Sequence, residues 1–261
     1  MGIEELQKIL SSTIKRLVEL LINYDKNSLS FSPLTHIKYK HRESLYYRMN
    51  SIIFHLQLLI FVKNQGINIL NKNIGNNNPV LLRNVIDELY YVFDDLIFNI
   101  LSLIDYLGNF IGYVYINKQN RKITWNRVVK TCRDQSNELS NKELNKYIIS
   151  VDKRLVNHLY EYRSILIHYN KDGSNAEHST HFDSKGINHT LNVEAPNLFV
   201  KTLKNIKIDI KSDILDVAFN SAYESLVIAQ KIVDLIAEDV IPKNEENMEK
   251  LYEEYKKRKD E

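Results

Sequence analysis

The chain has 261 residues, 44% of them hydrophobic, which is enough to bury the core of one large domain or of one domain with an appendage. Its formal net charge of +2 permits a local nucleic-acid surface but does not demand one, because dedicated nucleic-acid-binding domains are usually far more basic. The single Cys132 excludes an intramolecular disulfide framework and a cysteine-rich zinc site. With no secretory signal recognised in the opening residues, we expect a cytoplasmic protein.

Few glycines and prolines and long runs of periodic apolar residues favour an all-α fold. Apolar residues recur at spacings of three and four from Ile3 to Leu21, which predicts a first helix over residues 3–23. After a break at 25–33, a second helix is expected over 42–64, and the Gly- and Asn-rich run at 71–79 predicts a loop. We assign residues 1–78 to an N-terminal helical hairpin and its loop.

The next segment, Leu81 to Ile116, is apolar almost all round, which predicts a buried central helix. It is long enough to span a bilayer, but polar residues interrupt it at a high cost in lipid, so we expect no contact with a membrane. Six polar side chains share one stripe of this helix, at spacings of four and three: Asp95, Asn99, Ser102, Tyr106, Asn109 and Tyr113. The stripe should face a polar cleft, another subunit or solvent, since buried polar groups are costly unless paired.

A short helix is expected over 125–133, followed by a longer helix that begins near 142 or 151 and ends at 169. Alternating residues at 178–183 and 187–193 then predict a β-hairpin, inserted at about 176–200. Ser212 can cap a final helix, which we expect to stop before Pro242. The main domain would therefore cover residues 79–240, and residues 241–261 would form a charged C-terminal tail.

The helix that ends at 169 carries Arg163 and His168, which indicate phosphate chemistry. A forked, permanently charged guanidinium can hold a phosphate, and a histidine can move protons near neutral pH. Together they could cleave RNA without a metal or another cofactor. A second Arg–His pair, Arg48 and His55, is followed by no turn, and we expect it to be a chance match.

Arg163 and His168 lie off the predicted core stripe of their helix, which consists of Val151, Leu155, Leu159, Tyr162, Leu166 and Tyr169. At 100° per residue the two side chains are about 140° apart, so one straight helix does not bring them together. The helix must either unwind after Ile167 or pack against a second copy by two-fold symmetry, and we favour the second arrangement. Asn157 and Ser164 would then be polar neighbours of the paired site.

Arg163, the polar Ser164 and the histidine after four intervening residues resemble the motif of the HEPN superfamily, helical-bundle domains of prokaryotic defence and toxin systems. The resemblance covers about residues 80–240, and the N-terminal hairpin and the β-hairpin depart from a minimal HEPN domain. It implies a metal-independent endoribonuclease that acts as a homodimer on RNA, restrained by an antitoxin or triggered by phage infection with a defence-system partner. Tyr169 follows His168 directly rather than two residues later, so modification by a partner nucleotidyltransferase is not carried over.

Further residues complete the expected site. Asp95 or Asp105, with Asn99, could orient a catalytic histidine, and the exposed basic cluster that includes Arg127, Lys130 and Arg133 could contact RNA. A second basic cluster runs from Lys201 to Lys211. His178 and His181 are an odd number of residues apart on one strand and cannot share an ion, so no metal site is expected there.

An alternative stays open for the two residues and another for the whole chain. Arg163 could pair with a carboxylate on the bundle surface, while His168 caps a helix end. The chain could be a non-catalytic helical module that binds a protein partner or nucleic acid through the same helix face.

Overall fold

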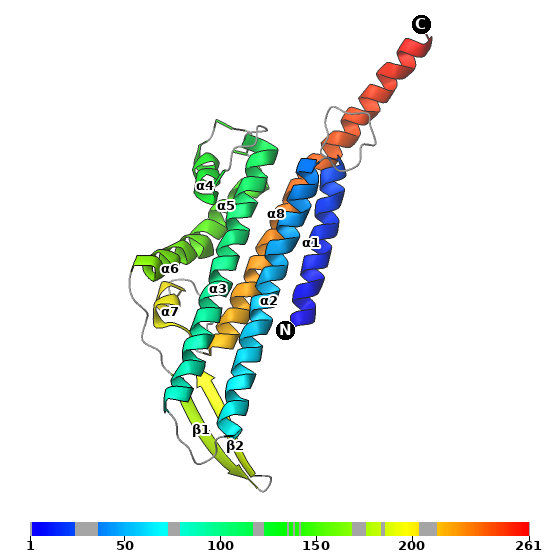
Figure 1. Ribbon diagram of the computed structural model, residues 1–261. Helices are drawn as coiled ribbons and strands as arrows, with labels where there is room; N and C mark the ends of the chain where they lie inside the picture. Colours follow the sequence, from blue (N-terminus) through cyan, green and yellow to red (C-terminus); the bar gives the residue numbers. More distant parts are fainter. Residues whose placement is uncertain are drawn as a thin grey trace. The chain divides into compact units, whose positions relative to one another are not determined.

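The computed structural model describes residues 2–23, 36–72, 79–116, 123–134, 136–137, 139–140, 142–168, 176–183, 186–203 and 213–260. Over these residues the protein is mostly helical, with one two-stranded antiparallel sheet, which confirms the all-α class and the expected β-hairpin (Figure 1). The chain forms two compact units. Unit 1 comprises residues 1–49, 105–149 and 226–261, and unit 2 comprises residues 50–104 and 150–225. The domain limits expected from the sequence, after residues 78 and 240, are not tested by this division and stay a prediction.

Unit 1 contains α1 (Ile3–Asn23), the start of α2 (His36–Lys72), the end of α3 (Pro79–Ile111) and the π-helical η1 (Gly112–Ile116). It also contains α4 (Trp125–Arg133), nearly all of α5 (Glu143–Val151) and the larger part of α8 (Ile214–Asp260). The observed bounds of α1 and α4 confirm the predicted helices at 3–23 and 125–133. The apolar stripe of α1 is buried as expected, since Leu6, Leu10, Leu17 and Leu21 are all in the core.

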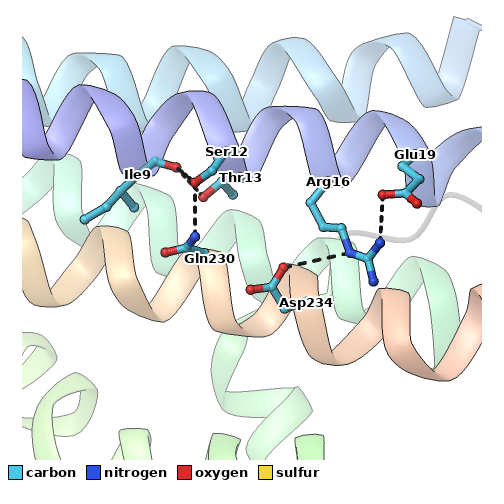
Figure 2. Close-up of polar contacts among 7 residues, drawn as sticks. All are labelled: Ile9, Ser12, Thr13, Arg16, Glu19, Gln230 and Asp234. Carbon is cyan, nitrogen blue, oxygen red and sulfur yellow. Dashed lines mark hydrogen bonds and ion pairs between the residues drawn. The ribbon is translucent and has the colours of Figure 1, made fainter.

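Polar contacts link α1 to α8 within unit 1 (Figure 2). Gln230 Nε2 donates a hydrogen bond to Ser12 Oγ at 3.0 Å, and Arg16 Nε lies 4.0 Å from Asp234 Oδ1. Both helices advance by four residues between these contacts, so α1 and α8 run parallel. Burial raises the pKa of Asp234, while the nearby Arg16 guanidinium lowers it. Arg16 also donates from Nη1 to Glu19 Oε2 at 2.7 Å, which holds the guanidinium at this seam.

His41 of α2 and Tyr106 of α3 form a reciprocal pair in unit 1. The Tyr106 hydroxyl donates to the His41 carbonyl at 2.7 Å and lies 2.8 Å from His41 Nδ1. Because the hydroxyl has only one proton, Nδ1 must carry the hydrogen of the second bond. Burial lowers the pKa of His41 to about 4, so its ring is neutral at pH 7. The polar stripe of α3 is therefore partly buried here against α2, where a paired partner offsets the cost.

The close approach of α4 to α3 depends on a glycine. A Cβ atom at Gly108 would lie 2.7 Å from the backbone nitrogen of Trp125, too near for any side chain to fit without movement. This contact lets the Trp125 side chain be fully buried at the start of α4. The glycine thus fixes where the predicted short helix attaches to the central helix.

Unit 2 contains residues 50–72 of α2, residues 79–104 of α3 and the start of α8. It also contains the π-helical η2 (Asp152–Val156), α6 (Asn157–His168), β1 (Ala176–Asp183), β2 (Gly186–Val193) and α7 (Asn197–Leu203). Ser51 pairs with Asn99, and Gly66 lies against Val85, so α2 and α3 are antiparallel. In the hairpin Ala176 pairs with Val193 and Asp183 with Gly186, which is the register of a two-residue turn.

Several predicted limits are wrong. The second helix is longer than 42–64, because α2 spans 36–72, and α3 already begins at Pro79, where a proline is tolerated in the first turn. The final helix does not stop before Pro242, since α8 continues to Asp260. Beyond the proline the sequence is rich in good helix formers, with Glu246 and Glu253 each four residues before a lysine, which favours continuation. The helix α7 was not predicted, and the proposed cap Ser212 lies outside the described residues.

Two segments, Lys40–Ile69 and Val80–Ile116, are long and apolar enough to cross a membrane by length and composition. The core helix of a soluble protein passes the same test, and most of the apolar window in the second segment is buried inside the protein. The two helices are therefore weak evidence for a membrane location.

Candidate functional site

The helix α6 is anchored in unit 2 by Tyr162, which the predicted core stripe correctly places in the interior. Its ring is buried and meets the ring of Phe199 from α7 edge to face, with ring centroids 4.9 Å apart. Its hydroxyl donates a hydrogen bond to Asp94 Oδ1 of α3 at 2.8 Å. A buried tyrosine hydroxyl requires such a partner, and the bond fixes α6 against α3 immediately before Arg163.

Asp94 has an unusual environment for a carboxyl group. The pKa of Asp94 is raised to about 6, chiefly by burial and to a smaller extent by the neighbouring Asp95, while the hydrogen bond from Tyr162 opposes the shift. A carboxyl with this pKa exchanges its proton close to neutral pH. Such perturbed groups concentrate at functional sites, although structural pairs show them as well.

Arg163 lies one residue further along α6 and is half-buried. The central carbon of its guanidinium is 5.9 Å from the centroid of the Phe98 ring of α3, which is a cation–π distance. Its Nε is the one buried side-chain nitrogen or oxygen, among the residues that the structure describes, without a hydrogen-bond partner. A buried donor without an acceptor costs about 1–3 kcal/mol, and an anionic ligand could supply the acceptor.

His168 is the last residue of α6, and its side chain lies outside the part of the chain that the structure describes. The backbone is α-helical through residue 168. The helix therefore does not unwind between Arg163 and His168, and the angle of about 140° between the two positions holds within one chain. An unwound helix after Ile167, one of the two arrangements considered from the sequence, is therefore not observed, and the two-fold pair stays a prediction.

The expected polar neighbours on α6, Asn157 and Ser164, are both exposed. On α3, Asp95 is exposed and Asn99 is half-buried. The Asn99 amide donates to the Asp95 carbonyl at 2.8 Å and accepts a hydrogen bond from Ser51 Oγ of α2 at 2.8 Å. Asn99 therefore has its partners on α2 and α3, and Asp95 and Asn99 stay only predicted orienting groups for a histidine.

Other predicted residues belong to unit 1. Asp105 is half-buried there, and the basic residues of α4, Arg127, Lys130 and Arg133, are all exposed. The chance match Arg48 lies over the Tyr106 ring at 5.1 Å and donates to the Ser44 carbonyl. His55, which belongs to unit 2, pairs through Nδ1 with the Ser51 carbonyl at 2.8 Å. Arg48 and His55 thus have different partners among the contacts described, and the expectation that they are a chance match stays a prediction.

The side chains of the hairpin histidines lie outside the described residues. The expectation that they form no metal site therefore stays a prediction. Within the described part of the chain, no group of three or more His, Cys, Asp or Glu side chains could hold a metal ion. Of the Lys201–Lys211 cluster, only Lys201 is described, and it is exposed.

Sequence reasoning missed the partners of the α6 residues, Asp94 and Phe98. The sequence pattern gives Asp94 only as one of the polar residues that interrupt the apolar segment Leu81 to Ile116, and it gives Phe98 no role. The sequence did contain a clue to Asp94. A buried tyrosine such as Tyr162 needs a hydrogen-bond acceptor, and the polar residues within the apolar segment Leu81 to Ile116 could supply one.

No family model, curated protein or solved structure matches this chain. A function for the protein must therefore come from the chemistry of its own residues.

Proposed function

We propose that the protein is a metal-independent endoribonuclease of HEPN type that works as a homodimer in the cytoplasm. Its role would be that of a toxin or an antiphage effector, controlled by an antitoxin or another partner of the same defence system. The observation that carries the proposal is the Nε of Arg163, a buried cationic donor with no acceptor among the described residues. A phosphate oxygen of RNA satisfies such a donor, and a forked guanidinium can hold two of these oxygens.

The reaction would be transesterification by the ribose 2′-hydroxyl. His168 removes the hydroxyl proton, and the 2′-oxygen attacks the phosphorus while the bond to the 5′-oxygen breaks. The departing 5′-oxygen takes a proton back from the protonated His168 or from water, which leaves a 2′,3′-cyclic phosphate and a 5′-hydroxyl end. Arg163 stabilises the charge that builds on the phosphate oxygens in the transition state. All bonds and protons balance without a metal or another cofactor.

Dimerisation would complete this site. Because α6 is helical through residue 168, Arg163 and His168 of one chain point about 140° apart. Two α6 helices related by a two-fold axis would bring His168 of the partner subunit toward Arg163. The exposed Asn157 and Ser164, with the half-buried Tyr160, share the helix face that would lie between the two copies.

A non-catalytic helical module is the second candidate, and one observation favours it. The guanidinium of Arg163 already contacts the Phe98 ring, so the residue could serve only to attach α6 to α3. In that case its removal would change stability and nothing else.

Cleavage of single-stranded RNA in the presence of EDTA tests the proposal. Arg163→Ala and His168→Ala should each reduce cleavage at least about 100-fold, the usual range for a lost acid–base or electrostatic group. The unfolding free energy should fall by no more than about 1 kcal/mol in Arg163→Ala, which loses one cation–π contact.

Matched controls lie in the same unit. Arg154→Ala removes an arginine whose Nη2 pairs with Glu224 Oε2 at 2.8 Å, and His158→Ala removes a histidine of α6 that is 3.9 Å from Glu161. Both should retain cleavage, as should Arg48→Ala and His55→Ala. Full activity in His168→Ala, or activity that only EDTA abolishes, would show that the assigned mechanism is wrong.

A further inference from the structure

The outer face of α2 in unit 2 carries a regular seam of exposed side chains. Six exposed residues follow one another at spacings of four, three, four, three and four, and we call them the α2 seam: Asn50, Phe54, Gln57, Phe61, Asn64 and Asn68. The opposite side of the same helix is buried and includes Ile52, Leu56 and Leu59. Alternating spacings of three and four are the pattern by which one helix packs along another.

The composition of the seam is not that of a solvated helix face. None of its six residues is charged, although 26% of the whole sequence is charged. Phe54 and Phe61 keep 56% and 57% of their surface exposed. Lys63, on the same stretch of helix, is engaged away from the seam with Asp213 at 2.8 Å. Aromatic residues and a lack of charge distinguish the core of a protein interface from ordinary surface.

We propose that the α2 seam pairs with the α2 seam of a second copy of this chain, as two helices side by side with Phe54 and Phe61 as the apolar contacts. An amide both donates and accepts hydrogen bonds, so the asparagines and Gln57 can pair with the same residues of another copy. Two uncharged faces also meet without burying an unpaired charge. RNA does not suit this surface, because a nucleic-acid strand needs basic residues along its path.

The paired segment is about 28 Å long, since it covers 19 residues at 1.5 Å each. The contact is isologous, so a two-fold axis relates the two copies. With the α6 contact as well, each chain would have two such contacts, and the assembly would be larger than a dimer. Four of the six seam residues are polar, so most of the stability of the pair would come from Phe54 and Phe61. This pairing does not depend on the proposed nuclease function, and it uses a different helix from the α6 contact.

Molar mass in solution is the first test. Phe54→Glu and Phe61→Glu would each place a charge in the paired seam, weakening association by roughly 100-fold or more and halving the mass measured by light scattering. Both positions are exposed in the single chain, so helicity by circular dichroism should not change. The control Tyr91→Glu alters an aromatic residue of α3 with a similar exposed fraction of 61%, and it should keep the wild-type mass.

Disulfide trapping provides the second test and gives the orientation. In a parallel pair each seam residue faces its own copy, so Gln57→Cys alone and Asn50→Cys alone should each cross-link. In an antiparallel pair over residues 50–68 the two-fold axis passes near residue 59. A mixture of Asn50→Cys with Asn68→Cys, or of Gln57→Cys with Phe61→Cys, should then cross-link instead. The native Cys132 does not interfere, because it is buried and burial raises its pKa to about 11.

A cross-linking control and four contrary results decide whether the seam pairs. Asn84→Cys, at an exposed position of α3, sets the level of random cross-linking. A monomeric wild-type chain, an unchanged mass in both Glu variants, or cross-linking no better than the control in both the parallel and the antiparallel cysteine sets would overturn the pairing. Binding of the wild-type seam to phosphatidylcholine vesicles in place of self-association would overturn it too. The Glu variants and the cysteine variants leave α6 unchanged and should not affect RNA cleavage, so they test the seam alone. A monomeric wild-type chain would also overturn the α6 pair, and the cleavage assay with Arg163→Ala and His168→Ala tests the nuclease proposal by itself.

Discussion

Tyr162 and Arg163 are neighbours on α6, and they differ in how their polar atoms are satisfied. The Tyr162 hydroxyl has Asp94 as its acceptor at 2.8 Å, whereas Arg163 Nε is buried without one. The first arrangement stabilises the packing of α6 on α3. The second leaves a buried donor unsatisfied, at a cost that an anion would remove if the side chain turned to expose Nε.

The raised pKa of Asp94 predicts a pH-dependent stability. The ordinary value is 3.8 and the folded value is about 6, so the folded state holds the proton more tightly than the unfolded state. The contribution of this group is most favourable below about pH 4 and is lost as the pH rises through 6, up to about 3 kcal/mol in all. Asp94→Asn keeps an acceptor for Tyr162 but cannot ionise. Its unfolding free energy relative to wild type should therefore rise between about pH 4 and pH 7.

Urea unfolding followed by circular dichroism at both pH values measures this difference. Glu88→Gln, an exposed carboxyl on the same helix, is the matched control and should show no such trend. A constant difference between Asp94→Asn and wild type would mean that Asp94 ionises normally in the folded protein.

Among the elements, those with a strong apolar period were predictable. The limits of α1 and α4 agree with the sequence pattern. The core stripe predicted for the helix that carries Arg163 is also observed, since Val151, Leu155, Leu159 and Tyr162 are buried. Local periodicity reports which side of a helix is buried, but not what lies against it. The helix α7 is too short to show a period, and the continuation of α8 past Pro242 depends on the helix formers that follow. Asp94 and Phe98 were missed because their roles arise only when α3 meets α6.

The contact between α3 and α4 predicts that Gly108 cannot be replaced. Alanine is favoured over glycine inside a helix by about 1 kcal/mol, yet its Cβ would lie 2.7 Å from the Trp125 nitrogen and 2.8 Å from its Cα. The backbone of α4 would have to move, so we expect Gly108→Ala to lower the unfolding free energy by about 1–3 kcal/mol. Trp125 is the only tryptophan, and its fluorescence should shift to the red as it becomes exposed.

Gly2→Ala is the control for this substitution, because no atom lies within 4 Å of its added Cβ. It should leave both the stability and the tryptophan emission unchanged. An unaltered Gly108→Ala protein would show that α4 is held loosely and that the glycine is not required.

At the scale of the whole molecule, the proposed α6 pair predicts a change of assembly. Ser164→Asp and Tyr160→Asp would bury an unpaired charge in that contact, which costs about 3–5 kcal/mol. Both variants should lose RNA cleavage together with half of the molar mass. Ser164 is exposed in the single chain, so this variant tests the contact without the risk of misfolding that the half-buried Tyr160 carries.

Asn220→Asp, at an exposed position of α8, is the control and should behave as wild type. Ser164→Asp combined with Phe61→Glu should be a monomer at all concentrations, since it lacks both proposed contacts. Full cleavage by a monomeric Ser164→Asp protein would rule out a site shared between two chains and favour one closed within a single chain.

The π-helical turn η2 holds one residue more than an α-turn, just before α6 begins. Deleting one residue between Asp152 and Val156 would let this turn revert to α-helix, and Tyr162 and Arg163 would still face the directions they face now. A deletion in the α-helical stretch between Asn157 and Glu161 is different, because each residue rotates a helix by about 100°. Arg163 would then take the place that Tyr162 holds against Asp94, unless η2 reverted to α-helix and restored the register. The turn therefore allows the chain to lose one residue here without changing which side chains face α3.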